Sequence, residues 1–243
     1  MKTLYESILG DIDTTLDSGA NEIKNLIKDF LLENYGNAKL CKISSKPNKD
    51  GKYIVNSEYA VSVKNSNCTS LTNEYFIFGT VKGNFNCTHC HSLMSLKGAP
   101  RKVVGDFNCY TCSKLKTLEG APQKIEGSFN CEWCESLTSL KDSPKEVGKN
   151  FQCNYCDSLK TLEDAPQKVG GNFECVECKR LQSLEGASKE VGGNFDCSYC
   201  SSLKSLEYAP KNVGKHFFCQ GCAGKFTKEN VKNVSNVEGK IYV

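Results

Sequence analysis

One motif, Phe-x-Cys-x-x-Cys, recurs seven times along the chain at intervals of 22 residues. No insertion or deletion interrupts the series. A period this strict predicts a solenoid, because each coil must present the same apolar positions to the coils before and after it. The copies open at Phe85, Phe107, Phe129, Phe151, Phe173, Phe195 and Phe217.

The repeat unit extends beyond the cysteines. A Val or Ile lies four residues before each Phe, two leucines follow the second Cys in all copies but the last, and most copies close on a small residue and a proline, as in Ala121-Pro122. We expect the Phe, the first Cys, both leucines, the Val and the Ala to point inward. Phe-x-Cys then forms a short strand entered through a Gly-rich turn, and Leu-x-x-Leu forms a second extended or helical face ended by the proline.

The periodic region is expected to span residues 59–222 as eight coils. One step back from the first clear copy, Val63 falls at the Phe position, Asn65 at the first Cys and Cys68 at the second Cys, which indicates a degenerate leading coil. After Cys222 the leucine positions hold lysines, so the repeat is expected to stop there. Residues 223–243, with a short helix candidate and a strand over 240–243, are then a C-terminal cap.

Residues 1–58 differ from the repeat and are predicted to cap its start. Helical spacing of apolar residues predicts one helix over residues 4–16 and a second over 20–35, with Gly36 as its stop. Residues 40–44 and 52–56 read as the strands of a β-hairpin. The alternative is that this segment is a separate docking module. The fold class is therefore α+β, a β-solenoid with a small helical N-terminal cap.

The repeat resembles leucine-rich repeats, most closely the short bacterial type, in stretches such as CSSLKSLEYAP and CDSLKTLEDAP. It is also similar to repeat proteins encoded by gut bacteria and their tailed phages, through Glu119–Pro122 and Val191–Phe195. The resemblance covers about residues 59–222, implies a leucine-rich-repeat-like solenoid, and departs from its relatives in the paired cysteines. Because that fold serves many recognition tasks, the resemblance by itself names no partner.

Three interpretations compete for the fourteen repeat cysteines. Cys87, Cys90, Cys109 and Cys112 satisfy a zinc-ribbon spacing, so zinc or an iron–sulfur cluster is one interpretation. The 22-residue period imposes that spacing with or without a metal, however, and we favour a ladder of small buried thiols whose S–H groups point at backbone carbonyls of the next coil. Disulfides come last, because a chain that is not exported meets reducing buffers. No metal or cofactor is therefore predicted.

Composition and motifs exclude several function classes. The net charge is +3 without blocks of like charge, which disfavours a nucleic-acid binder. Mean hydropathy is −0.44 and no apolar run approaches a membrane span, while Glu6 interrupts any secretion signal, so we expect a cytoplasmic protein. The three histidines accompany no nucleophile elbow or phosphate loop, so we expect no enzyme.

A column of outward residues is the predicted binding site. The residue before each second Cys varies in a way that packing does not require, with polar residues at the flanking outward position. Exposed aromatic rings beside polar groups are typical of protein interfaces, and Tyr110 adjoins the column. We expect a protein partner at His89, Tyr110, Trp133, Tyr155, Glu177 and Tyr199. The competing interpretations are that the rings only stack to stiffen the rod, or that the protein is a metal-binding solenoid.

Overall fold

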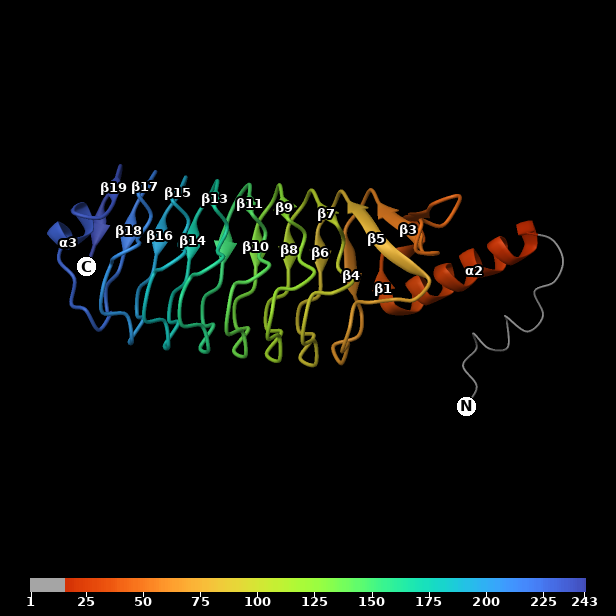
Figure 1. Ribbon diagram of the computed structural model, residues 1–243, viewed down its shortest axis with the longest axis horizontal. Coiled ribbons are helices and arrows are strands. Elements are labelled where there is room, and N and C mark those ends of the chain that lie inside the picture. The colour runs from red at the N-terminus through yellow and green to blue at the C-terminus, as the bar shows by residue number, and fades with distance from the viewer. Residues whose placement is uncertain (1–15) are drawn as a thin grey trace.

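The coils of the chain stack into a rod, with α2 at one end and α3 at the other (Figure 1). This computed structural model describes residues 16–243, and the helix expected over residues 4–16 lies outside them apart from Leu16, the first residue of α2. Two ten-stranded sheets run along the rod, and in each sheet all neighbouring strands pair in parallel except the first pair, which is antiparallel. The predicted β-solenoid with a small N-terminal helix is confirmed.

The first sheet carries the Phe position of each coil. Parallel pairing aligns each Phe with the Phe of the next coil, as in Phe129 with Phe151. After β1 (Tyr35–Gly36) and β4 (Val61–Val63), its strands are β6 (Phe85–Asn86), β8 (Phe107–Asn108), β10 (Phe129–Asn130), β12 (Phe151–Gln152), β14 (Phe173–Glu174), β16 (Phe195–Asp196), β18 (Phe217–Phe218) and β20 (Ile241–Tyr242).

The second sheet carries the Val or Ile position, whereas the Leu-x-x-Leu segment, expected as an extended or helical face, belongs to neither sheet. That segment follows a series of turns, in which Leu115 N donates to Cys112 O at 2.9 Å and Ala121 N to Leu118 O at 2.8 Å. The strands of this sheet are β2 (Cys41–Ile43), β3 (Tyr53–Ser57), β5 (Phe76–Val81), β7 (Lys102–Val103), β9 (Lys124–Ile125), β11 (Glu146–Val147), β13 (Lys168–Val169), β15 (Glu190–Val191), β17 (Asn212–Val213) and β19 (Asn236–Val237).

The predicted inward positions form the core. In the complete coils the Phe, both Cys, both Leu and the Val or Ile are buried, and Phe rings of neighbouring coils lie 5.1–5.6 Å apart between centroids. Apolar surface is thus removed from water in continuous stacks along the rod, which supplies the main driving force for folding.

The first coil departs from the predicted register. β4 pairs Val61, and not Val63, with Phe85, so the strand is offset by two residues from the repeat. The period resumes at Asn65, whose carbonyl accepts a hydrogen bond from Cys90 Sγ at 3.7 Å. The Asn65 side chain does not fill a ladder position, because it is exposed and its Oδ1 accepts from Asn67 N in a local turn.

After Cys222 the spacing changes from 22 to 24 residues, and the segment expected as a C-terminal cap adds one more coil to both sheets. β19 extends the second sheet beside β17, and β20 extends the first sheet, where Ile241 aligns with Phe217. α3 (Lys228–Lys232) replaces the Leu-x-x-Leu turns in this last coil, and Thr227 caps it by accepting from Asn230 N.

At the other end the apolar interior is closed by α2 (Leu16–Asn34), which buries Ile27 and Leu31 and brings Phe30 within 6.0 Å of Phe76 between ring centroids. A 3-10 turn, η1 (Ala38–Leu40), links β1 to the antiparallel pair β2 and β3.

Candidate functional site

A tight turn between the two cysteines of each coil places one side chain at the same point of every coil. The residue at this point has φ between 54° and 71°, the left-handed region. Its backbone N–H pairs with the next coil, as Tyr155 N does with Val176 O at 2.9 Å, so neighbouring side chains follow the strand spacing of about 4.8 Å. We call this set the turn column: His89, Thr111, Trp133, Tyr155, Glu177, Tyr199 and Gly221.

The structure brings the predicted site residues together in pairs. Trp133 and Tyr155 stack face to face with ring centroids 4.1 Å apart. His89 shares a 2.6 Å hydrogen bond with Thr111 Oγ1 and meets the edge of Tyr110 at 5.8 Å between ring centroids. Stacking therefore accounts for part of the column, while no ring within residues 16–243 stacks on Tyr199, which is 53% exposed.

Glycine is compatible with the turn column, as Gly221 shows. A Cβ added to Gly221 would lie 2.4 Å from Cδ1 of Tyr199, so the Tyr199 ring rests on this glycine and leans toward the C-terminal end of the rod. The turn itself does not need a side chain, since glycine adopts positive φ without steric cost. The side chains of the other six residues are not required to make the turn.

Beside the turn column lies a hydrogen-bonded set that we call the polar row: Asn130, Glu132, Gln152, Asn154 and Glu174. Gln152 Nε2 donates to Glu174 Oε2 at 3.1 Å, and Asn154 Nδ2 donates to carboxylates of both Glu132 and Glu174. In the next coil, burial raises the pKa of Asp196, and the Glu174 carboxylate raises it further. This network orients acceptor oxygens along the same face as the exposed rings.

The repeat cysteines form a sulfur ladder within the core. Each second Cys from Cys112 to Cys222 donates through Sγ to the carbonyl of the first Cys one coil back, as Cys112 does to Cys87 O at 3.1 Å. Several first cysteines donate forward instead, as Cys109 does to Asn130 O at 3.3 Å. All sixteen cysteines are free. The described part of the chain holds no group of three or more His, Cys, Asp or Glu arranged to bind a metal ion.

The protonated thiol is the stable form inside this ladder. Hydrogen bonding between the Cys153 and Cys178 thiols, in which Cys153 keeps its proton, raises the pKa of Cys153, and burial raises it further. The hydrogen bond with Cys131 lowers the pKa of Cys156, but burial and the neighbouring Cys178 and Cys134 outweigh it and raise that pKa to about 11. Thiolates, the form that attacks disulfides and ligates metals, are therefore disfavoured at neutral pH.

A second ladder was missed by the sequence reasoning. The residue before each Phe uses its side-chain oxygen, or the Nδ1 of His216, to accept the backbone N–H of its equivalent one coil on, as Asn172 Oδ1 does from Asn194 N at 2.9 Å. The sequence does contain a pattern that could have revealed this ladder, because every residue at the position before Phe has a side chain that can accept a hydrogen bond. These residues are Asn84, Asp106, Ser128, Asn150, Asn172, Asn194 and His216.

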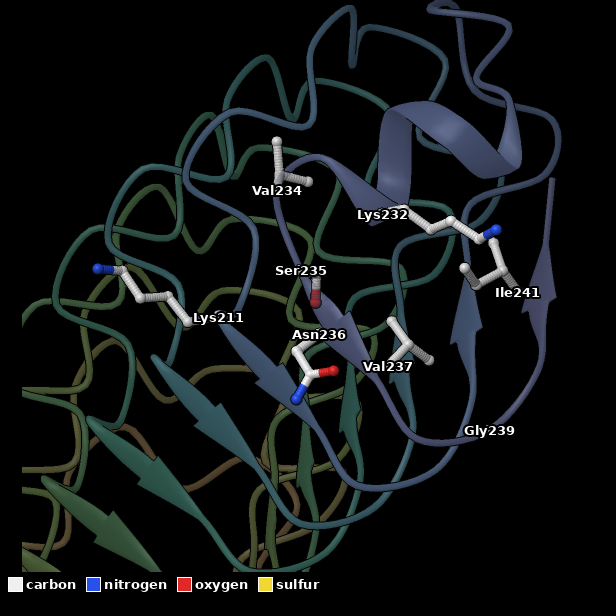
Figure 2. Close-up of a pocket in the computed structure, with 8 residues that line it drawn as sticks. All are labelled: Lys211, Lys232, Val234, Ser235, Asn236, Val237, Gly239 and Ile241. Atoms are coloured by element: carbon white, nitrogen blue, oxygen red, sulfur yellow. The ribbon is translucent and has the colours of Figure 1, made fainter.

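A hollow of about 610 Å³ lies at the C-terminal end of the rod (Figure 2). Figure 2 shows Lys211 and Lys232 directed away from one another around its rim, with Val237 and Ile241 on the strands that line it. The side chains of its four polar lining residues are not joined to one another by any hydrogen bond in the described part of the chain, unlike those of the polar row, so the turn column is the better candidate site.

Comparison of the chain with protein-family models, with curated proteins and with solved structures gives no significant match. Among residues 16–243, no helix combines the length and the apolar character needed to cross a bilayer. The interpretation of the site therefore rests on its own geometry.

Proposed function

We propose that this chain is a non-enzymatic protein-binding module, a solenoid of the leucine-rich-repeat type that engages a protein partner through the turn column. The resemblance of the repeat to bacterial and phage proteins supports this type, and the sixteen free thiols support a reducing compartment such as the cytoplasm. The partner contacts would come from His89, Trp133, Tyr155, Glu177 and Tyr199, with Tyr110 beside them.

The observation that carries the proposal is backbone strain. Six consecutive members of the turn column have a side chain despite a positive φ, which costs roughly 1–2 kcal/mol for each residue that is not glycine. Thr111 is β-branched and the other five side chains are large. None of these six residues therefore escapes the cost of positive φ as glycine would. Strained residues persist mainly where the side chain has a use, and such outliers concentrate at functional sites.

Exposure and chemistry support a protein as the partner. Trp133 is 39% exposed and Tyr199 53%, and both lie beside the amides and carboxylates of the polar row. Tyr and Trp are the residues that most often dominate protein interfaces, because they bury a large rigid surface at a small entropic cost.

The test compares three proteins as bait for lysate of the source cells. The first is the wild type and the second carries Trp133→Gly, Tyr155→Gly and Tyr199→Gly, since glycine removes the rings without adding strain. The third is a control that removes exposed apolar side chains elsewhere, with Tyr59→Ala, Met94→Ala and Tyr208→Gly; Tyr208 has φ 66° and is 55% exposed.

We expect a partner that the wild type and the control retain and that the triple-glycine variant binds at least about thirtyfold more weakly, the effect of losing a hot-spot cluster of about 2 kcal/mol. Circular dichroism checks that all three proteins are folded. The same set of proteins captured by all three baits would place the binding surface elsewhere and overturn the proposal.

A further inference from the structure

The turn column contains a gap between two tyrosines. Tyr155 and Tyr199 are two coils apart, about 9.6 Å at the strand spacing, with Glu177 in the coil between them. Tyr155 stacks on Trp133 with one face, so its other face is directed at the coil of Glu177. Tyr199 leans the opposite way, onto Gly221. The two rings therefore leave the space above Glu177 uncovered by either of them.

Glu177 has no close ionic partner of its own. Lys179, two residues further on, pairs with Asp157 at 2.9 Å and interacts with Glu177 only at longer range. The Glu177 carboxylate makes no hydrogen bond or close ion pair in the described part of the chain, although its side chain is half-buried. A half-buried carboxylate without a close ion pair favours binding of a cation.

The surroundings of this gap are acidic. Glu132, Glu174 and Asp196 lie on the same face of the first sheet, at outward positions of neighbouring coils. The ammonium of Lys179 donates its short hydrogen bond to Asp157, and Glu177 attracts it only at longer range. The face therefore complements a positively charged group rather than a negative one.

We propose that the gap between Tyr155 and Tyr199 binds an arginine side chain of the protein partner, an inference that rests on the proposed function. The planar guanidinium stacks on the free face of Tyr155 and donates parallel hydrogen bonds to the Glu177 carboxylate. Arginine fits better than lysine, because an ammonium group can neither stack in a plane nor make a bidentate contact.

The test uses a defined probe and a unique reporter. Trp133 is the single tryptophan, so its indole N–H gives one peak in a proton–nitrogen NMR spectrum, to be followed with the amide peaks of Tyr155 and Glu177. The probe is an acetylated and amidated five-residue peptide of Gly and Ser around one central Arg, titrated at physiological salt. Matched peptides carry Lys or the uncharged isostere citrulline in place of Arg.

We expect a saturable shift of these three peaks with the Arg peptide, a weaker response with Lys, and at least about tenfold weaker binding with citrulline, the effect of losing a charge-assisted hydrogen bond. The substitution Glu177→Gln should weaken binding of the Arg peptide by a similar factor. Glu163→Gln, which removes the same charge from an exposed side chain on another column, should leave its binding within about twofold.

Three results would overturn the inference: no saturable shift with the Arg peptide, an equal response to citrulline, or equal weakening by Glu177→Gln and Glu163→Gln. The last result would mean only unspecific attraction to an acidic surface. If the Arg peptide fails while the triple-glycine variant still loses its partner, the turn column binds a partner of other chemistry. If the Arg peptide does not bind and the triple-glycine variant captures the same proteins as the wild type, the proposed function itself is wrong.

Discussion

Leu162 shows how little freedom the repeat leaves to an inward side chain. It is fully buried, with a complete coil on each side. We expect Leu162→Ala to lower the free energy of unfolding by about 2–5 kcal/mol, through lost burial and the cavity left behind. Urea denaturation measures this loss, and an unchanged transition would contradict the inward assignment.

Asn172 represents the ladder before each Phe. Its Oδ1 accepts from Asn194 N at 2.9 Å and its Nδ2 donates to Glu174 Oε1 at 3.0 Å. Asn172→Ala should cost about 1–2 kcal/mol of unfolding free energy, because a backbone N–H loses its partner. Asn172→Ser should cost less, since Ser128 accepts from Asn150 N in the same way at 3.3 Å. Equal stability of wild type and both variants in urea denaturation would show that the ladder contributes nothing.

At the scale of elements, the sequence predicted the interior well because one period governs it. The set of inward residues follows from spacing alone, and in the complete coils each member is buried except Ala187, which is partly buried. The strand at the Val or Ile position was not predicted, because a strand of two residues such as Lys124–Ile125 carries no alternation to detect. The terminal coils were misjudged for a related reason: Val61 and Ile241 take the place of Phe at an offset of two residues, which a search at fixed period passes over.

The site was predicted only as a list of residues. Sequence variation identified the turn column as outward, but its left-handed backbone was hidden, because six of its seven members are not glycine. Contacts such as the Trp133–Tyr155 stack depend on rotamers that a repeat pattern does not encode.

Equivalence of the coils leads to a prediction about deletion. Removing residues 107–128 joins Asp106 to Phe129 and returns each inward position to register, because the segment is one period long. We expect a shorter, folded protein with a cooperative thermal transition. Removing only residues 107–117 breaks the register, so that protein should aggregate or remain unfolded. Identical behaviour of the two deletions would contradict the coil as the unit of the fold.

At the scale of the whole molecule, the sulfur ladder ties stability to pH. Thiol–thiol hydrogen bonding and burial raise the pKa of Cys131, Cys153, Cys175 and Cys197 above the ordinary value of 9.0. A raised folded-state pKa gives stability that is fully present below the unfolded-state pKa and is lost as pH rises above it. The free energy of unfolding should therefore be level up to about pH 8 and fall above about pH 9.

Urea unfolding from pH 7 to pH 11 measures this dependence, and the ultraviolet absorbance of thiolate, corrected for tyrosinate by its separate band at longer wavelength, reports cysteine ionisation. The folded protein should show less thiolate at pH 9–10 than the unfolded chain, in which all sixteen cysteines titrate. Thiolate absorbance that rises equally in folded and unfolded protein would contradict the ladder.

The central claim is that the interior alone builds the rod and that the turn column is free for binding. Its most direct test is the free energy of unfolding of the variant with Trp133→Gly, Tyr155→Gly and Tyr199→Gly, measured in urea beside wild type and Leu162→Ala. Loss of the Trp133–Tyr155 stack costs about 0.5–1.5 kcal/mol, and relief of positive φ at three residues offsets it. We predict that the variant loses no more than about 1.5 kcal/mol, the largest cost expected for the stack, and that relief of positive φ can make it more stable than wild type. A loss of about 4 kcal/mol or more, the size of a core truncation, would show instead that the rings are part of the structure that holds the rod together.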